Sequence, residues 1–458
     1  MIRTGALCRY ILFPLLSVSG FLSVRAQGGH QEQWLEQKNY MTFSPARRDS
    51  AGRLQPLQSY DETVRRAMDF VVAGLPGWFR GDRRTLLDER GIERPVYFYY
   101  SNLMYSGEVS KSEVDRFVSY PAFHHSLFIR TFVAYYRYTG DSLYLGKARE
   151  LADWNIAHST PASYPYGGMP YSTFEEGRPG GFRDGTCIMT DKAAIMALAY
   201  LQLYDETREK RYRDAARLIG KNLAANQSPE GNWPFRVDPR TREVKEPYTS
   251  SVIYAVELFE RLEALRGGKR FRQNRDRALK WLLDGPVRTL QWRGFYEDIP
   301  EQAANRTNWD CIDVVRYLAR HSGAHPEYLA PASRLCSFIN DSVVREGMTF
   351  LSTRHPYAPA EAVREQAVCF VPMSVHSAHW AAMMRDMYRA TGDSRFERRA
   401  AQTMNYITYH LQPNGIILLD VDYPNEGRGM VFNQFWFSIH FGSTLFLLEY
   451  LLGDGRSQ

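Results

Sequence analysis

The chain has 458 residues, of which 44% are hydrophobic and 24% are charged, so it can bury a large core and is not a long disordered chain. Its formal net charge is +6, spread without any basic block of the kind that binds nucleic acid. Aromatic residues make up 14% of the chain, which fits a tyrosine-rich core as well as a cleft in which rings stack on sugars.

The N-terminus predicts a secretory signal peptide over residues 1–26. Arg3 and Arg9 form a basic start, the run 10–22 is apolar but interrupted, and residues 24–26 include a small side chain where a signal peptidase cleaves. No later stretch approaches about 18 uncharged apolar residues. We therefore expect a periplasmic or secreted protein that is not inserted in the membrane once the signal is removed.

Residues 27–57 are polar and show no periodicity, which predicts a flexible lead-in before a single domain over 58–453. In that domain, most segments carry apolar residues at the spacing of an amphipathic helix. The predicted helices are 61–73, 125–138, 143–157, 191–204, 212–225, 250–265, 271–283, 308–321, 328–344, 374–391, 394–411 and 435–452. Strand patterns are short and sparse, the best being 95–100 and 416–421.

The predicted helices are joined by a recurring phrase. Tyr-Thr-Gly-Asp-Ser-Leu-Tyr occupies 138–144, Ala-Thr-Gly-Asp-Ser-Arg-Phe occupies 390–396, and a related junction begins at Tyr204. A glycine there can end one helix in the left-handed conformation, and the following aspartate can cap the next helix. A repeat of helix, short capped turn, helix and long loop predicts hairpins that must stack to bury their apolar faces.

This phrase, together with the Gln-x-x-x-Gly-x-Trp turn at 227–233, resembles the α/α-toroid enzymes that act on carbohydrate. That group includes unsaturated glucuronyl hydrolases, other uronate-acting glycoside hydrolases, polysaccharide lyases and sugar epimerases. The resemblance spans roughly 61–452 and implies an all-α fold, an (α/α)6 toroid with a few short hairpins in its loops. It also implies a substrate cleft formed by the loops at one end of the ring.

The loop 164–185 combines acids, bases and tyrosines with many glycines and prolines. Its candidate catalytic residues are Glu175, Glu176 and Asp184, and its candidate substrate-binding residues are Tyr166, Arg178 and Arg183. Two guanidinium groups can hold a substrate carboxylate in bidentate fashion. The alternative is a surface loop with ordinary ion pairs.

The resemblance to glucuronyl hydrolases implies that Asp184 is a general acid/base, although an aspartate before a helix is often only an N-cap. That family has another aspartate one helix pair upstream. This sequence has no acid there and carries His124 and His125 instead, which we predict to bind substrate. The departure puts the family's specific hydrolysis in doubt.

A second cluster lies at 295–310, before another predicted inner helix. Glu297 and Asp298 are candidate catalytic carboxylates, and the candidate substrate-binding residues are Arg306, Asn308, Trp309 and Asp310. Cleavage of a glycosidic bond uses two carboxyl groups, one to protonate the leaving oxygen and one to activate water or attack the sugar. The alternative is a capped, salt-bridged loop.

Further candidate substrate-binding residues are Trp233, Arg236, Tyr248, His376, His379 and Trp380. Histidines at i and i+3 can share a metal, but no third ligand stands at a suitable offset, so we predict no metal site there. The same histidines, with a tyrosine, can abstract the proton next to a carboxylate, which is lyase chemistry.

Cysteines remain at 187, 311, 336 and 369 after signal cleavage, without CxxC spacing. Disulfides and buried thiols both stay open. No cofactor is expected, the expected partner is a glycan rather than a nucleic acid, and the oligomeric state is open. The first functional hypothesis is a glycoside hydrolase for glycans that contain uronic acid. The alternatives are a polysaccharide lyase or uronate epimerase on the same fold, and a glycan-binding protein without catalysis.

Overall fold

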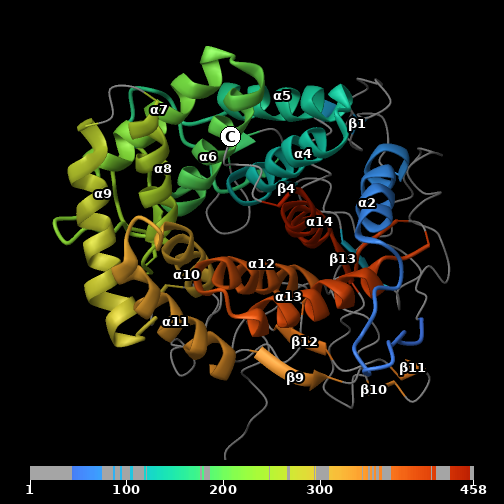
Figure 1. Cartoon of the computed structure of the whole chain (residues 1–458). Helices are drawn as coiled ribbons and strands as arrows, with labels where there is room; N and C mark the ends of the chain where they lie inside the picture. The colour runs from blue at the N-terminus through green and yellow to red at the C-terminus, as the bar shows by residue number, and fades with distance from the viewer. Residues whose placement is uncertain are drawn as a thin grey trace, which may run out of the picture.

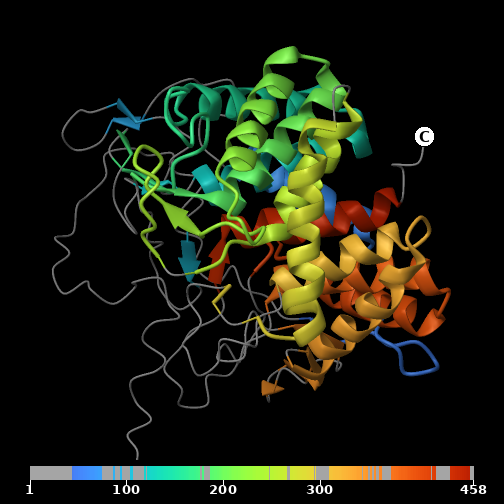
Figure 2. The ribbon, with the colours of Figure 1, turned by 90° about the vertical axis from the view of Figure 1, so that its left-hand side faces the viewer.

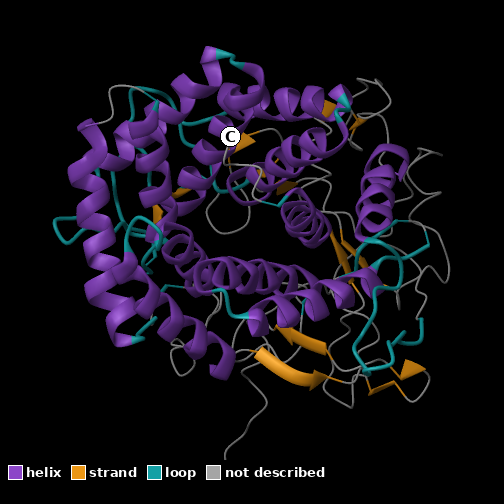
Figure 3. Ribbon diagram, in the orientation of Figure 1, coloured by secondary structure: helices purple, strands orange, loops and turns teal. Residues whose placement is uncertain are grey.

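The structure is a computed structural model, and helices dominate it (Figure 3). The residues that it describes are 44–74, 86–87, 93–94, 104–106, 118–119, 121–175, 178–179, 186–246, 248–265, 269–292, 294–295, 309–342, 344–348, 351–352, 355–356, 360–363, 373–413, 415–418 and 434–453. Within these ranges no helix combines the length and the apolar character that crossing a membrane requires.

In the described part of the chain, six helices form an inner ring (Figure 1). They are α4 (Ser126–Thr139), α6 (Thr190–Thr207), α8 (Val252–Ala264), α10 (Trp309–His321), α12 (Ser374–Thr391) and α14 (Phe437–Leu452). Each packs against the next, and α14 packs against both α12 and α4, which closes the ring.

Each of the first five inner helices leads into an outer helix that packs on its outer side, while α14 packs against the outer helix at the start of the fold. The outer helices are α2 (Tyr60–Gly74), α5 (Ser142–Ala157), α7 (Lys210–Ala225), α9 (Lys269–Leu282), α11 (Leu329–Ser342) and α13 (Ser394–Ile407). The fold is therefore an (α/α)6 toroid, which confirms the predicted fold class.

The junctions between inner and outer helices have the predicted caps. Gly140 takes a left-handed φ of 76° at the end of α4, and the Asp141 side chain accepts from the N–H of Leu143 at 2.9 Å. Gly392 (φ 72°) and Asp393 repeat this arrangement between α12 and α13. After α6 the left-handed residue is Arg208, so this junction reaches the same turn without glycine.

Because the short turns all follow inner helices, the N-terminal ends of the inner helices lie together at the end of the ring that carries the long connections. Paired strands occur in these connections. They are β1 (Leu86–Leu87) with β2 (Glu93–Arg94), β3 (Met104–Ser106) with β13 (Gln434–Trp436), β4 (Val118–Ser119) with β5 (Phe174–Glu175) and β6 (Arg178–Pro179), β7 (Ile188–Met189) with β8 (Arg236–Val237), β9 (Val344–Met348) with β12 (Ala360–Val363), and β10 (Leu351–Ser352) with β11 (His355–Pro356).

The largest boundary differences are at the end of α13, which stops at Ile407 before a 3-10 turn over Thr408–His410, and at the end of α6, which extends to Thr207. Helix α11 ends at Ser342, before β9, and α14 begins at Phe437, after β13. The predicted strand at 95–100 lies outside the described residues. In the predicted strand at 416–421, the described residues form a single antiparallel bridge between Leu411 and Ile417.

The described part of the segment predicted to be a flexible lead-in, residues 44–57, lies along α13. The backbone N–H of Leu54 donates to Gln402 at 2.8 Å, and Asn405 donates to the Leu54 carbonyl at 2.8 Å. Farther on, the N–H of Leu57 donates to the Thr408 hydroxyl at 2.9 Å. A polar sequence without periodicity can therefore be fixed by side chains of another element.

The inner ring and the gaps between it and the outer helices are filled by one hydrophobic core. Cys187, Cys311 and Cys336 are buried in this part of the protein and form no disulfide with a described residue. Burial raises the pKa of the Cys336 thiol to about 12, so it is not a reactive thiolate at neutral pH.

Candidate active site

Polar and ionisable side chains gather in the first two turns of the inner helices, which are largely apolar. They are Asp191 and Lys192 on α6, Tyr254 on α8, Trp309, Asp310 and Asp313 on α10, and His376 and His379 on α12. Since the inner helices begin at the same end of the ring, residues far apart in the sequence meet there. We call this set the axial cluster.

Asp191 stands in the first turn of α6 and is 5% exposed. Its carboxylate accepts from the N–H of Lys192 at 2.7 Å and from the N–H of Ser251 at 3.4 Å. The ammonium group of Lys192 lies 3.4 Å from the same carboxylate and 5.1 Å from the centre of the Phe123 ring. Asp191 is thus a carboxylate held by backbone donors beside a cation.

Asp310, in the first turn of α10, is 2% exposed. Burial raises the pKa of its carboxyl to about 8; Lys192 opposes the shift, and the negative charges of Asp191 and Asp313 add to it. Its Oδ1 atom has no hydrogen-bond partner among the described residues. At neutral pH Asp310 is therefore mainly a protonated acid, which is the form that can give a proton to a substrate.

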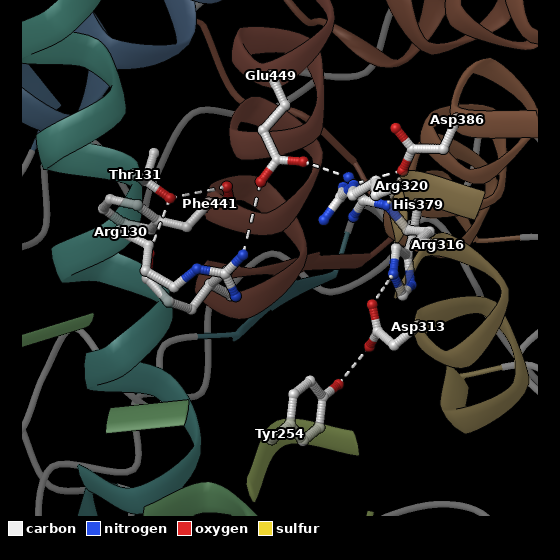
Figure 4. Close-up of polar contacts among 11 residues, drawn as sticks. Arg130, Thr131, Tyr254, Asp313, Arg316, Arg320, His379, Asp386, Phe441 and Glu449 are labelled. Carbon is white, nitrogen blue, oxygen red and sulfur yellow. Dashed lines mark hydrogen bonds and ion pairs between the residues drawn. The ribbon is translucent and has the colours of Figure 1, made fainter. Parts of the chain in front are cut away.

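Three side chains form a hydrogen-bonded chain beside Asp310 (Figure 4). The Tyr254 hydroxyl donates to one oxygen of Asp313, and His379 Nε2 lies 2.7 Å from the other oxygen. Trp309 Nε1 donates to the Tyr254 hydroxyl at 2.8 Å. Burial disfavours the charged form of Asp313, but His379, Arg316 and Tyr254 together lower its pKa to about 2.

The two histidines of the axial cluster are buried, and burial disfavours their charged forms. Desolvation lowers the pKa of His376 to about 3 and also lowers that of His379. Since Nε2 of His379 faces an ionised Asp313, the proton of the neutral ring belongs on Nε2. This leaves the Nδ1 lone pair of His379 free of hydrogen-bond partners in the described part of the chain. The rings of Trp309 and Phe446 lie 4.7 Å and 4.5 Å from the His379 ring.

A second group of charges lies beyond the His379–Asp313 pair (Figure 4), and we call it the ion-pair network. Arg316 Nε is 2.9 Å from Asp386 and its Nη2 is 2.7 Å from Glu449. Arg320 contacts Asp386 at 2.9 Å, and Arg130 contacts Glu449 at 3.5 Å. These salt bridges join four inner helices, α4, α10, α12 and α14. They stabilise the ring rather than offer an open group to a ligand.

Four of the predicted substrate-binding residues meet in the axial cluster: Trp309, Asp310, His376 and His379. The ring centres of Trp309 and His376 are 5.1 Å apart. Trp309 is partly exposed, whereas the others are buried. An aromatic ring with one accessible part next to two carboxyl groups suits a sugar-binding subsite.

Four other predicted substrate-binding residues lie elsewhere and are enclosed. Trp233 is 1% exposed and donates to the Leu223 carbonyl, and Trp380 is fully buried and donates to Asn340. These rings have no exposed face for a sugar in this structure, and their predicted role in substrate binding stays a prediction. Arg236 is 2% exposed with Glu246 at 3.2 Å, and Tyr166 is 3% exposed.

The remaining described candidates lie around the start of α4. His125 is buried, and its Nδ1 lies 3.1 Å from the side-chain nitrogen of Asn155 in α5. His124 packs against the rings of Phe123 and Phe128. Tyr248 is partly buried against a small apolar cluster of Ala122, Met189 and Phe235.

Several predicted residues lie outside the described residues, or their side chains do. These are the candidate catalytic residues Glu175, Glu176, Asp184, Glu297 and Asp298, and the candidate binding residues Arg178, Arg183, Arg306 and Asn308. Their roles stay predictions. The helices that follow these two loops are α6 and α10, and the first turns of α6 and α10 meet in the axial cluster.

The sequence reasoning missed Asp191, Lys192, Tyr254 and Asp313. The available signal was a charged residue in the first turn of an apolar helix, as in Thr-Asp-Lys-Ala-Ala at the start of α6. Asp310 and Asp313 are also spaced i and i+3, which places both on one face of α10. Only the closure of the ring reveals that these faces converge.

Comparisons with known proteins agree with this fold. The sequence profile of Glycosyl hydrolase family 47 matches residues 127–281, which include Asp191 but not Asp310. The mannosyl-oligosaccharide alpha-1,2-mannosidase IA of Drosophila melanogaster is 27% identical over 168 residues. That match covers 35% of this chain and 25% of the relative, so the chain spans about a quarter of the curated protein that it matches.

Solved structures of sugar-active proteins share the ring. A sugar epimerase from a ruminal bacterium superposes with a TM-score of 0.58 and 14% identity, covering 86% of this chain and 99% of that one. A D-mannose isomerase gives 0.59 and 12%, covering 85% and 97%. The family 76 alpha-mannanase of Bacteroides thetaiotaomicron gives 0.56 and 10%, covering 86% and 95%. At these identities the likeness establishes the fold: the chain is an (α/α)6 toroid like those of glycosidases and sugar epimerases.

Proposed function

We propose that this protein is a glycoside hydrolase, in which Asp310 is the general acid and Asp191 is the second carboxylate. The observation that carries the proposal is the contrast between these two groups. Asp310 is buried with a pKa of about 8, whereas Asp191 faces two backbone N–H groups and an ammonium. One protonated and one ionised carboxyl group is the pair that glycosidic cleavage requires.

In the proposed reaction Asp310 gives its proton to the glycosidic oxygen as the bond to the anomeric carbon breaks. Asp191 either removes a proton from the attacking water or attacks the anomeric carbon itself. Trp309 supports the sugar ring, and Lys192 lies beside the carboxylate that carries negative charge. The partial match to Glycosyl hydrolase family 47 supports the reaction class.

For the substrate, we propose a glycan that contains a uronic acid. Support comes from the Lys192 ammonium in the axial cluster, which is positioned to attract a substrate carboxylate, and from Arg178 and Arg183 in the sequence of the preceding loop. The names of the proteins compared above point instead to mannose-containing glycans. A neutral mannoside is therefore the rival substrate that an experiment must include.

A second candidate function is a lyase or an epimerase, and His379 is the observation that favours it. Its neutral ring keeps Nε2–H on Asp313 and leaves the Nδ1 lone pair without a partner among the described residues. Such a nitrogen can remove a proton from a sugar carbon next to a carboxylate or a carbonyl group.

The decisive experiment is a panel of short oligosaccharides with and without uronic acid, analysed for new reducing ends, for ultraviolet absorbance and for deuterium taken up from the solvent. A hydrolase makes reducing ends without absorbance, a lyase makes an absorbing 4,5-unsaturated uronate, and an epimerase takes up deuterium. A protein that binds a glycan and changes none of these three signals is the non-catalytic alternative.

The same panel is repeated with Asp310→Asn, Asp191→Asn and His379→Gln, with Asp184→Asn and Glu297→Gln testing the two residues that lie outside the described ranges. We expect the first two variants to lose hydrolysis. Wild-type rates in both Asp310→Asn and Asp191→Asn would refute the assignment, and a selective loss in His379→Gln would favour the second candidate.

A further inference from the structure

Two outer helices, α7 and α9, carry an unusual concentration of positive charge. Together they contain eleven lysines and arginines against two aspartates. The whole chain has a net charge of only +6, so the remainder of the chain is net negative. Other outer helices carry less net charge: α5 has two basic and two acidic residues, α2 has two and three, and α13 has three and one.

The two helices are neighbours on the outside of the ring. Figure 2 shows them side by side, with α9 in front, and Asn274 of α9 donates to the carbonyl of Ala224 in α7 at 3.0 Å. We call the outer surface of these two neighbouring helices the basic face. Each helix is roughly 20 Å long, so the basic face is long enough to follow a polymer.

Part of this charge is not neutralised within the protein. Four of the eleven cations contact acidic side chains, namely Arg211, Arg213, Arg275 and Lys280. In contrast, Lys221, Arg270 and Arg272 are exposed and form no ion pair with any described residue. Like charges held close together raise the free energy of the folded protein unless a counter-ion or partner neutralises them. The basic face is therefore prepared for an anionic partner.

The composition of the basic face favours a carboxylated polysaccharide over a membrane. Large exposed hydrophobic side chains in the described ranges are Phe123, Leu143, Val244 and Tyr388, and none of them lies on α7 or α9. Helices that bind lipid surfaces bury an apolar face in the bilayer, which this pair cannot do. Seven of the eleven cations are arginines, whose planar guanidinium group matches carboxylates.

We propose that the basic face formed by α7 and α9 is a secondary binding surface for a polyuronate, which holds the polymer while one of its ends or links reaches the axial cluster. This proposal rests on the proposed function for its choice of polymer. Electrostatic capture of this kind raises the local substrate concentration and weakens as salt screens the charges.

The test measures binding of the full chain to polygalacturonate, neutral mannan, an oligodeoxynucleotide and vesicles of anionic phospholipid, at low and at high salt. The variant is Lys221→Glu/Arg270→Glu. The matched control is Arg48→Glu/Arg398→Glu, which makes the same change in net charge on the N-terminal segment and α13. These two lie across the ring (Figure 1), and their guanidinium groups contact Gly52 and Ser394 rather than acids.

We expect the wild type to bind polygalacturonate in a salt-dependent way and to ignore mannan. The test variant should bind about tenfold more weakly, and the control variant should change by less than about twofold. Both variants should keep the wild-type rate on a short oligosaccharide, which does not reach the basic face.

Equal losses in both variants would overturn the proposal, because they would show an effect of net charge alone. Tighter binding to the oligodeoxynucleotide or to the vesicles than to polygalacturonate would overturn it as well. Failure of the proposed hydrolysis is separate: Asp310→Asn should abolish activity while leaving polygalacturonate binding unchanged.

Discussion

The axial cluster and the ion-pair network are both buried, charged and built from the inner helices, yet their groups are satisfied differently. In the ion-pair network Arg316 binds Asp386 and Glu449 at 2.9 Å and 2.7 Å. In the axial cluster Asp310 keeps an oxygen without a partner in the described ranges and has a pKa near 8. A buried polar group left unpaired lowers stability, and this cost, together with the raised pKa, is the basis for proposing that Asp310 serves chemistry rather than folding.

Asp310→Asn is expected to have the largest effect, and it tests most directly whether the axial cluster serves a different role from the ion-pair network. Loss of the general acid should lower kcat/KM about a hundredfold to ten-thousandfold. Stability should change in the other direction. The unfolded Asp310 ionises near pH 4 but the folded one only near pH 8, so the wild type loses stability as the pH rises between these values.

The gain in stability of Asp310→Asn over the wild type should therefore grow from pH 4 to pH 8. Thermal unfolding at several pH values, together with steady-state kinetics, measures both effects. A variant that loses activity and is less stable than the wild type at pH 8 would instead indicate that Asp310 is a structural residue.

Arg316→Met is expected to have the next largest effect, and mainly on stability. It leaves the buried carboxylate of Asp386 with weaker partners, which should lower the free energy of unfolding by about 3 kcal/mol. Arg320→Met is the matched control, because Arg320 contacts the same carboxylate but is 36% exposed, and it should cost less than about 1 kcal/mol. Denaturant unfolding measures both variants, and equal losses would contradict the assigned difference.

His440 is a buried residue whose side-chain nitrogens both have hydrogen-bond partners, and the pH dependence of stability tests its structural role. Its Nδ1 accepts from the N–H of Ile417 and its Nε2 donates to the Ala67 carbonyl, and desolvation lowers its pKa to about 4. An unfolded histidine takes up a proton below about pH 6.5, so the protein should lose stability as the pH falls from 6.5 to 4.

The expected contribution of His440 to this loss is about 1.4 kcal/mol per pH unit. His440→Gln removes the titrating group while keeping one donor and one acceptor, and should make the acid dependence shallower by that amount. The measurement is the free energy of unfolding between pH 4 and pH 7. An unchanged slope would mean that His440 is already charged in the folded protein.

Lys192→Met should give the smallest effect, and it tests how Lys192 influences the pKa of Asp310 within the axial cluster. Lys192 opposes the rise in the pKa of Asp310, so its removal should raise that pKa further, by about one unit or less. Because activity requires protonated Asp310, the fall of kcat/KM at alkaline pH should begin at a higher pH in the variant. A shift to lower pH would show that the titrating acid is not Asp310.

Much of the candidate site escaped prediction because its residues come from four helices, and each helix contributes only one to three of them. Asp310 and Trp309 stood in a conspicuous polar cluster and were singled out, although as binding residues. Asp191 and Tyr254 look like ordinary residues of amphipathic helices, and nothing within a short window distinguishes them. Conversely Trp233 and Trp380 were predicted to bind substrate, but their rings are enclosed by the core.

The sequence by itself determined the helical hairpins and their caps, because both depend on short-range patterns: apolar residues at a spacing of three to four and a Gly-Asp pair at the turn. It also indicated that such hairpins must stack into a ring. Only the tertiary structure decided which polar residues lie together at the axis of the ring. Asp191, one of the neighbours that raise the pKa of Asp310, is more than a hundred residues away in the sequence. Burial and the electrostatic effect of residues distant in sequence arise only when the helices pack into the closed ring, so no single segment of the sequence shows them.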